Sequence, residues 1–275
     1  MTVTIVTGAG GGLGSATVAA LAARGHHVVA VDSDADRAAA AIDSLDGEHL
    51  AVGADISDES DVDRYLQAAV DRFGAVHHHV LNAGISGPLD PLPDLRIEDF
   101  DRVIAVNLRG TFLGVRAAFR QYRVQPELGA IVITASIASL RGSADLLPYQ
   151  TSKHGVLGLV HGAAMYGGPL GIRVNAVAPG IVPTALFAAA GANAVGGMAD
   201  MAHRASTTPL RRPGTGADIA GVICFLLSDD AGYVTGQVVS ADGGATNMNT
   251  VRPSGGAGAW DTAAVDLTTY GGPTA

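Results

Sequence analysis

The stretch "TVTIVTGAGGGLGSATVAALAARG", residues 2–25, decides the fold of this 275-residue chain. Residues 2–7 are all β-branched, which predicts a buried strand. Residues 13–24 are rich in alanine and leucine, which predicts a helix. Glycines fill most of the connection between the two segments. A strand, a glycine-rich turn and a helix in this order begin a β-α-β unit.

The same alternation of strand and helix patterns continues along the chain. Further strands are predicted at residues 26–32, 49–55, 77–84, 129–136, 172–180 and 236–244, and helices at 34–45, 58–73, 97–123, 149–166 and 216–228. Because each right-handed crossover lays its helix on one face of the sheet, this order implies a parallel sheet between helical layers. The sequence therefore predicts an α/β fold: a single-domain, Rossmann-like, doubly wound sheet of about seven parallel strands with helices on both faces.

Two regions break this rhythm. Residues 184–216 are rich in Ala, Gly and Pro with weak periodicity, and we expect them to form a lid over whatever the sheet binds. Residues 245–275 form a C-terminal extension beyond a catalytic domain predicted at 1–244. One reading of this extension is disorder. The other is an arm that docks on a neighbouring subunit through Trp260.

The composition is that of an acidic globular protein. The net charge of −9 argues against general binding to nucleic acid or to anionic membranes, since both need basic surfaces. No apolar run is long enough to span a bilayer, and the chain begins with a strand pattern instead of a basic leader. The one cysteine, Cys224, lies in the apolar run "GVICFLLS", which predicts a buried thiol. We therefore expect a protein of the reducing cytoplasm.

The run of three histidines at 77–79 is not interpreted as a metal site. Successive residues of a strand point to opposite faces of the sheet, so three neighbouring imidazoles do not converge on one ion.

The glycine loop "TGAGGGLG", residues 7–14, has the properties of a pyrophosphate site. Glycines let the backbone approach a phosphate closely, and the helix that follows presents aligned N–H groups. The spacing Gly8-x-x-x-Gly12-x-Gly14 lacks the Gly-Lys-Ser/Thr ending of a phosphate loop, which disfavours an NTPase. The sequence therefore predicts a dinucleotide site.

Acidic residues at two strand ends indicate which dinucleotide. Asp32 closes the second strand, where a carboxylate can accept hydrogen bonds from both hydroxyls of an adenosine ribose. Its charge would repel a 2′-phosphate, so NAD is favoured and NADP disfavoured. Ser33 or Asp34 is expected to cap the next helix. Asp55, followed by Ile56, is placed to meet the adenine, with a turn or cap role as the alternative.

Tyr149 and Lys153, in "PYQTSKHG", lie four residues apart in a predicted helix. Positions i and i+4 share a helix face, so the phenol and the ammonium group should lie close together. A phenol beside an ammonium group can act as an acid/base device, although a surface pair is the alternative for this motif by itself.

Several spaced motifs together resemble the short-chain dehydrogenase/reductase family, in its compact single-domain form, from about residue 4 to residue 244. The quoted matches are Thr7, Gly8, Gly12 and Gly14 in the glycine loop, Asn82-Ala83-Gly84, Asn107 in "VNLRG", Ser136 thirteen residues before Tyr149, the Tyr149/Lys153 pair, Pro179-Gly180, and Thr184. The cofactor contacts that follow from the resemblance and from the strand ends are Thr7, Gly8, Gly12, Leu13, Gly14, Asp32, Ser33, Asp55, Ile56, Asn82, Ala83, Gly84, Tyr149, Lys153, Pro179, Gly180, Val182 and Thr184.

The resemblance implies a mechanism of hydride transfer to a nicotinamide, with Tyr149 as the proton carrier. A free phenol has a pKa of about 10. Lys153 and the positive nicotinamide of the oxidised cofactor are both expected to lower that pKa. Ser136 would bind the substrate oxygen, Asn107 would hold the water through which the proton leaves, and Thr184 would fix the carboxamide. Ser139 is a rival to Ser136, but the thirteen-residue spacing favours Ser136.

The predicted substrate pocket is small and largely apolar. Its expected lining is Ser86, Ile137, Leu146, Leu186, Phe187 and Met201. An uncharged secondary alcohol or ketone, cyclic or apolar, therefore fits best. A reductase of an acidic or acyl-carrier substrate stays open because Arg204, Arg211 and Arg212 are near.

Two further functions compete with that interpretation. One is an S-adenosylmethionine-dependent methyltransferase, in which Tyr149 and Lys153 would have no task. The second is a catalytically silent NAD sensor or scaffold, which would be expected to lose part of the Ser136, Tyr149 and Lys153 set that this chain keeps. The resemblance also suggests a homotetramer.

Overall fold

The computed structural model describes residues 1–184, 205–206, 208–248 and 267. Its seven strands are β1 (Val3–Thr7), β2 (His27–Asp32), β3 (Leu50–Gly53), β4 (His78–Leu81), β5 (Ala130–Thr134), β6 (Arg173–Pro179) and β7 (Val238–Ala241). They form one parallel sheet in the order β3-β2-β1-β4-β5-β6-β7. The predicted doubly wound sheet is confirmed.

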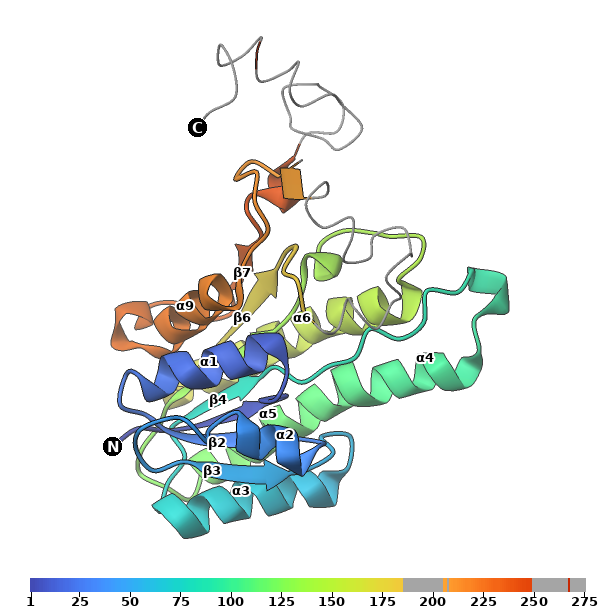
Figure 1. Cartoon of the computed structure of the whole chain (residues 1–275). Helices are drawn as coiled ribbons and strands as arrows, with labels where there is room; N and C mark the ends of the chain where they lie inside the picture. Colours follow the sequence, from blue (N-terminus) through green and yellow to red (C-terminus); the bar gives the residue numbers. More distant parts are fainter. Residues whose placement is uncertain (185–204, 207, 249–266, 268–275) are drawn as a thin grey trace.

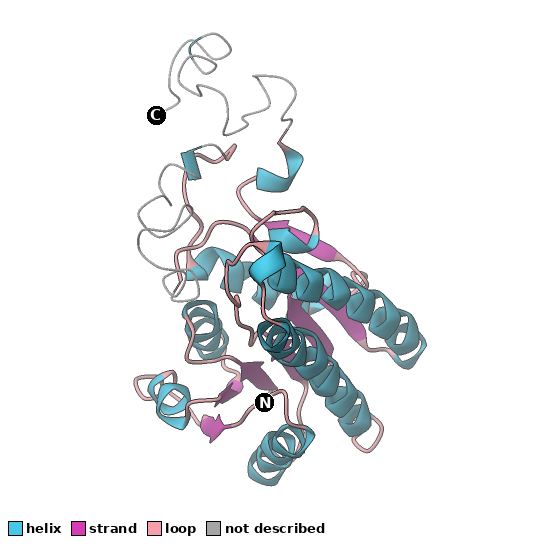
Figure 2. Cartoon of the chain, turned by 90° about the vertical axis from the view of Figure 1, so that its right-hand side faces the viewer, coloured by secondary structure: helices cyan, strands magenta, loops and turns pink. Residues whose placement is uncertain are grey.

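Helices cover both faces of this sheet (Figures 1 and 2). They are α1 (Gly12–Ala22), α2 (Ala35–Ala40), α3 (Glu59–Phe73), α4 (Ile97–Ile104), α5 (Thr111–Tyr122), α6 (Leu147–Gly167) and α9 (Gly216–Leu227). Helices α1 and α9 pack on one face together with the segment after α2. Helices α3, α5 and α6 pack on the other face. The central strands are therefore apolar on both sides, as a parallel sheet requires.

The buried core follows from the strand composition. All five residues of β1 and of β5 are buried, and valine or isoleucine fills most of these positions. Branched side chains suit a strand whose two faces are both covered. Cys224 is a residue of α9 and is buried on the side of that helix that packs in the core, as the sequence predicts.

Two helices differ from their predicted form. The helix predicted at 34–45 ends at Ala40, and tighter turns replace it, with the Ile42 amide donating to Ala39 and the Leu45 amide to Ile42. The helix predicted at 97–123 is interrupted by a π-helical turn, Ala105–Gly110. A π-turn inserts an extra residue into the helix and is common at functional sites. Asn107 lies within it.

The order of the strands positions the site. The chain leaves β1 toward β2 in one direction and reaches β4 on the other side of β1, so the connections diverge between β1 and β4. Ligands of open α/β sheets bind in the crevice that this reversal creates at the carboxyl ends of the strands. No helix among the described residues is long and apolar enough to cross a membrane.

Candidate active site

The glycine loop between β1 and α1 closes on itself. Gly8 has φ +66°, a conformation that favours glycine, and a Cβ there would lie 2.8 Å from the Ala83 Cα. A Cβ on Gly14 would lie 2.0 Å from the Gly8 carbonyl oxygen. The loop backbone and the start of α1 therefore pack too tightly for any other residue. Gly11, the N-cap of α1, has no side-chain cap, so the first N–H groups of the helix stay available for a phosphate.

Asp32 reaches this loop from the end of β2. It is buried, and its carboxylate accepts hydrogen bonds from the Gly10 amide (2.9 Å) and the Asp34 amide (3.2 Å). Arg37 donates to the Gly10 carbonyl (3.4 Å). The α2 N-cap is Asp34, one of the two residues proposed for it, while Ser33 is exposed. Asp32 is therefore free of the capping role and adjoins the glycine loop.

Asp55 and Ile56 are engaged in local structure. The Asp55 carboxylate accepts from the amide (2.9 Å) and the hydroxyl (2.8 Å) of Ser57, which makes the turn that the sequence left open as its alternative role. Ile56 is buried, and its Cδ1 would lie 2.8 Å from a Cβ on Gly110.

A network of polar groups joins the ends of three strands. The Thr7 hydroxyl accepts from the amides of Asn82 (3.0 Å) and Ala83 (3.2 Å). The Asn82 side chain donates to the Thr7 carbonyl (3.1 Å) and accepts from the Thr134 hydroxyl (3.1 Å). The glycine loop, the Asn82–Gly84 segment and β5 are thereby held in one arrangement.

The π-turn places Asn107 in a fully buried position. Its side-chain oxygen accepts from the Ile85 amide (2.8 Å), and its nitrogen donates to the Ile85 carbonyl (2.8 Å) and the Ser152 hydroxyl (3.0 Å). The buried amide is fully partnered, as a buried amide must be. A Cβ on Gly84 would lie 3.1 Å from the Asn107 oxygen, so a side chain there would need the Asn107 amide to shift by a few tenths of an ångström.

Ser136, Tyr149 and Lys153 come together from β5 and α6. Ser136 begins a short 3₁₀ turn, Ile137–Ser139, and its hydroxyl is hydrogen-bonded to the Tyr149 phenol. The Lys153 ammonium lies 5.8 Å from the centroid of the Tyr149 ring and donates to the Thr134 carbonyl (2.7 Å). Ser139 instead accepts from the Ser136 amide and serves as a cap. The geometry favours Ser136 over its rival.

Burial controls the protonation of the Tyr149/Lys153 pair. It lowers the pKa of Lys153 to about 8, because the charged ammonium loses hydration. Burial raises the pKa of the Tyr149 phenol, and the Ser136 hydrogen bond opposes that rise. Sequence reasoning expected Lys153 and the oxidised cofactor to lower the phenol pKa. For the chain alone the direction is opposite, since lost hydration outweighs the hydrogen bond.

Ser136, Tyr149 and Lys153 line a cavity of about 80 Å³ at the carboxyl ends of the strands. Its lining is Leu13, Asn82, Gly84, Thr134, Ala135, Ser136, Tyr149, Lys153, Pro179, Gly180, Val182 and Thr184. Ten of these twelve residues are among the predicted site residues. Thr134 and Ala135 are not, because a threonine and an alanine at a strand end carry no distinctive pattern.

The predicted substrate residues are only partly placed. Ser86, Ile137 and Leu146 are half-buried and lie outside the lining of this cavity. Leu186, Phe187 and Met201 lie outside the described residues, with most of the predicted lid.

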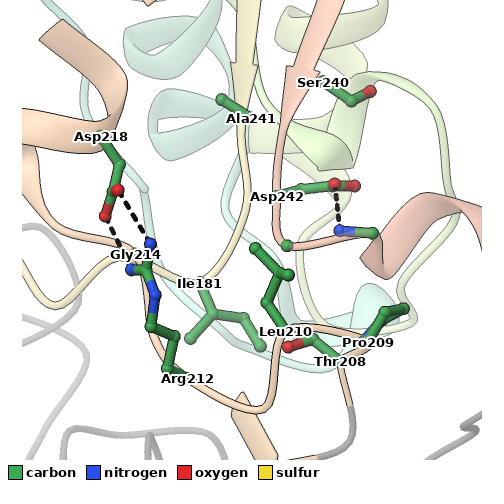
Figure 3. A pocket seen from close by; sticks show the side chains of 12 residues that line it. Ile181, Thr208, Pro209, Leu210, Arg212, Gly214, Asp218, Ser240, Ala241 and Asp242 are labelled. Atoms are coloured by element: carbon green, nitrogen blue, oxygen red, sulfur yellow. Dashed lines mark hydrogen bonds and ion pairs between the residues drawn. The ribbon is translucent and has the colours of Figure 1, made fainter. Parts of the chain in front are cut away.

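A larger cavity of about 440 Å³ lies beyond β7 (Figure 3). Its charged groups are already paired: Arg212 binds Asp218 at 2.9 and 3.0 Å, and the Asp242 carboxylate accepts from the amides of Gly244 and Thr246. None of the predicted catalytic residues lines it. The polar groups that could support chemistry therefore belong to the smaller cavity.

Comparison with known proteins identifies the family. Residues 8–246 match a family model described as enoyl-(acyl carrier protein) reductase, which belongs to the short-chain dehydrogenases/reductases. Levodione reductase of Leifsonia aquatica is 38% identical over 253 residues, covering 88% of this chain and 93% of that protein. Cyclohexanol dehydrogenase of Acinetobacter sp. (strain SE19) is 37% identical over 252 residues, covering 89% and 95%.

Solved structures agree with these matches. The crystal structure of levodione reductase has a TM-score of 0.84 at 37% identity, covering 89% of this chain and 97% of that one. A 3-ketoacyl-(acyl-carrier-protein) reductase from Brucella melitensis, complexed with NADH, has a TM-score of 0.82 at 30% identity, covering 89% and 98%. The chain belongs to the short-chain dehydrogenase/reductase family. It is an oxidoreductase of the alcohol dehydrogenase and ketone reductase class that uses a nicotinamide cofactor.

Proposed function

We propose that this enzyme transfers a hydride between NAD(H) and an uncharged, apolar or cyclic secondary alcohol or ketone, with Tyr149 as the acid/base. The observation that carries the proposal is the meeting of Ser136, Tyr149 and Lys153 at one cavity, with the phenol hydrogen-bonded to Ser136. In this arrangement Tyr149 would move the proton, Ser136 would bind the substrate oxygen and Lys153 would supply positive charge.

The residues around the glycine loop fit a dinucleotide. Gly8 and Gly14 leave no space for side chains between loop and helix, the α1 N-terminus has no side-chain cap, and Asp32 presents a buried carboxylate beside Gly10. The loop and α1 would hold the pyrophosphate, and Asp32 the adenosine ribose. The nicotinamide supplies the centre that accepts or gives the hydride.

The chain's own groups would manage the proton. In alcohol oxidation the Tyr149 phenolate takes the hydroxyl proton while the Ser136 hydroxyl donates to the same substrate oxygen. Because burial raises the pKa of Tyr149 in the chain alone, the phenolate depends on nearby positive charge. Lys153 provides part of that charge. Asn107 would order the water through which the proton leaves, and Thr184 would hold the carboxamide of the nicotinamide.

NAD is proposed over NADP because of Asp32. A buried carboxylate at the end of β2 accepts hydrogen bonds from ribose hydroxyls and repels a 2′-phosphate. Arg37 lies next to Gly10 but donates to its carbonyl, and Asp34 and Asp36 surround it.

The substrate class is proposed from the lining and from the relatives. The site cavity has one charged side chain, Lys153, among the residues that line it. Relatives include cyclohexanol dehydrogenase, levodione reductase and a cis-4-hydroxycyclohexanecarboxylate dehydrogenase from Sinomonas cyclohexanicum. The second and third of these names, for cyclohexanol and a hydroxycyclohexanecarboxylate, favour a six-membered ring, and the carboxylate of the third also supports the acidic alternative. The second candidate, an acyl-carrier or acidic substrate, is supported by the description of the matching family model and by the ketoacyl reductase structure.

Assembly and location are part of the proposal. Exposed apolar side chains on α5 and α6, Phe112, Met165 and Tyr166, would be covered in a homotetramer. The extension at 245–275 would serve as an inter-subunit arm; of it, only 245–248 and Leu267 are described. Light scattering of the full chain and of a chain ending at Met248 tests both ideas. The buried thiol of Cys224 is compatible with a reducing cytoplasm.

The deciding experiment is NADH formation at 340 nm over a panel of secondary alcohols. The panel contains cyclohexanol, a substituted cyclohexanol, 2,3-butanediol and a 3-hydroxyacyl thioester, each with NAD and with NADP. Turnover of the cyclic alcohols with NAD supports the proposal. Turnover of the thioester alone would replace the apolar substrate by an acyl-carrier one. Tight NADH binding without turnover of any alcohol or ketone would favour a silent sensor.

A further inference from the structure

Ser152 directly precedes Lys153 and follows Tyr149 by three residues. The sequence alone assigns it no role. The structure buries it completely within α6. Its hydroxyl donates to the Tyr149 carbonyl (2.6 Å) and accepts from the Asn107 side chain (3.0 Å). One small hydroxyl thus contacts both the helix that carries the phenol and the π-turn that carries Asn107.

The hydrogen bonds around Asn107 show what Ser152 contributes. The Asn107 amide pairs with both backbone groups of Ile85, which uses its oxygen and one N–H. The remaining N–H points to Ser152. Because the Ser152 proton goes to the Tyr149 carbonyl, the hydroxyl oxygen is free to accept, and every bond in this chain of contacts has one donor and one acceptor.

The same contact fixes the arrangement of three segments. Ile85 directly follows the Asn82–Gly84 segment of the site, Asn107 lies in the π-turn, and Tyr149 lies in the first turn of α6. The Gly84 backbone lies between them, so close that a Cβ there would meet the Asn107 oxygen at 3.1 Å and the Lys153 ammonium at 3.5 Å. Movement of the Asn107 amide would therefore change the surroundings of Lys153 as well.

We infer that Ser152 is a positioning residue for the oxidoreductase reaction: its hydroxyl holds the Asn107 amide against the turn of α6 that carries Tyr149 and Lys153. The inference rests on the proposed roles of Tyr149 and Asn107. Removal of the hydroxyl leaves a buried N–H of Asn107 without an acceptor, and the amide is then held only by its two bonds to Ile85 and no longer tied to α6. Small displacements of groups beside the reacting atoms reduce turnover more than they reduce cofactor binding.

The test compares Ser152→Ala with wild type, using the best alcohol of the panel above. The concentration of folded sites is taken from NADH fluorescence titration, so that kcat refers to competent protein only. We expect kcat to fall about tenfold, with the dissociation constant for NADH changed less than about twofold. Ser152→Thr retains a hydroxyl and should recover most of the lost kcat. An unchanged kcat in Ser152→Ala, per NADH-binding site, would overturn the inference.

A double-mutant cycle separates positioning from a general effect on the fold. If Ser152 acts through Asn107, Ser152→Ala should cost little further activity in an Asn107→Ala background. Fully additive losses in the double variant would overturn the inference. Thr4→Val is the matched control, because it removes another fully buried hydroxyl at the opposite end of the sheet. It should lower the melting temperature and leave kcat unchanged.

Tyr149→Phe, measured in parallel, separates a failure of the proposed acid/base role of Tyr149 from a failure of the Ser152 inference. Full activity of Tyr149→Phe would overturn the proposed acid/base and the Ser152 inference together. Loss of activity in Tyr149→Phe with normal kcat in Ser152→Ala would overturn only the inference about Ser152.

Discussion

The two ends of the parallel sheet use polar side chains in different ways. At the carboxyl end, Thr7, Asn82 and Asn107 bond to backbone groups and shape the site. At the amino end, histidine side chains form the hydrogen bonds to backbone groups. The Nδ1 atoms of His77, His78 and His49 accept hydrogen bonds from the amides of Val3 (3.0 Å), Ala130 (3.1 Å) and Val28 (3.1 Å), at the beginnings of three strands.

Because the two ends use different side chains, catalysis and stability in mild acid should depend on different parts of the sheet. Hydroxyl and amide groups keep the same hydrogen-bonding pattern in mild acid, so the contacts made by Thr7, Asn82 and Asn107 should not weaken there. An imidazole nitrogen accepts only while it is unprotonated. Burial lowers the pKa of His78 to about 4 and that of His79 to about 3, and it also lowers those of His26 and His77. Activity should therefore depend on one end of the sheet and acid stability on the other.

The largest effect is expected at the carboxyl end, from Tyr149→Phe. The variant removes the proposed proton carrier and its hydrogen bond with Ser136 but keeps the ring that packs beside Lys153. We expect kcat to fall about a thousandfold. NADH binding and the melting temperature should change little. Steady-state rates at 340 nm and thermal unfolding provide the two measurements, and a loss of less than about tenfold would exclude Tyr149 as the main acid/base.

The second effect is a loss of stability in mild acid that arises at the amino end. The pKa of His78 is about 4 in the folded chain, against 6.5 for a histidine side chain that is fully hydrated, as in the unfolded chain. Between these values the unfolded chain binds more protons, so the free energy of unfolding decreases as the pH falls from about 6.5 toward 4. His78 alone contributes about 3 kcal/mol to this decrease.

Urea unfolding at pH 7.5, 5.5 and 4.5 measures this loss. The groups facing His78 are His26, His77 and Arg173, whose positive charges lower its pKa further, while a backbone hydrogen bond with His77 acts in the opposite direction. The pKa values of Asp58, Asp61 and Asp218 are lowered, so the stability that these carboxylates add is lost only below the pH range of the experiment. A free energy of unfolding that stays constant from pH 7.5 to 4.5 would contradict the role of the histidines.

The third effect concerns cofactor choice and uses Asp32→Asn. Asparagine keeps one oxygen that can accept from the Gly10 amide and loses only the bond from the Asp34 amide, so the contact with the glycine loop is kept while the negative charge is removed. We expect the ratio of kcat/KM for NADP to that for NAD to rise about tenfold. Asp34→Asn is the control, since that carboxylate caps α2. An equal rise in both variants would mean that overall charge, and not the position of Asp32, selects NAD.

Periodicity predicted the fold, and spacing together with the family resemblance predicted most of the residues that meet at the site cavity. The buried strands are β-branched runs, and the order of strands and helices leaves little choice of topology. Tyr149 and Lys153 were identified by their four-residue spacing and Ser136 through the resemblance to the family, and the structure brings these three together. Local pattern reveals such residues whenever the chemistry demands a particular residue type at a particular distance.

The remaining features depend on contacts between distant segments. Thr134 and Ser152 are ordinary residues whose importance lies in what they touch, Asn82 and Asn107. The π-turn at Asn107 breaks a helix whose apolar pattern is continuous. The histidine run suggested only that a metal site is improbable, because strand geometry reveals nothing of the backbone amides on neighbouring strands. The direction of the Tyr149 pKa follows from burial, which the sequence does not supply.

The smallest effects are expected from substitutions of two neighbouring histidines of β4, His78 and His79. The two changes in the free energy of unfolding should have opposite signs. His79 is fully buried, its ring packs edge-on against Tyr122 at 5.8 Å, and neither nitrogen has a hydrogen-bond partner among the described residues. His79→Leu removes two unsatisfied polar atoms from the core and should raise the free energy of unfolding by about 1–2 kcal/mol at pH 7.5. His78→Leu removes the acceptor of the Ala130 amide and should lower it by about 1 kcal/mol.

The pH dependence of these two variants completes the comparison between the ends of the sheet. Both lack an imidazole that must stay uncharged in the fold, so both should lose less stability than wild type between pH 7.5 and pH 4.5. Urea unfolding at the two pH values gives the differences, and kcat measured at pH 7.5 should stay within about twofold of wild type because neither histidine lies near the site. A large fall in kcat for either variant would show that the amino end of the sheet also controls catalysis, and the separation of the two ends would then fail.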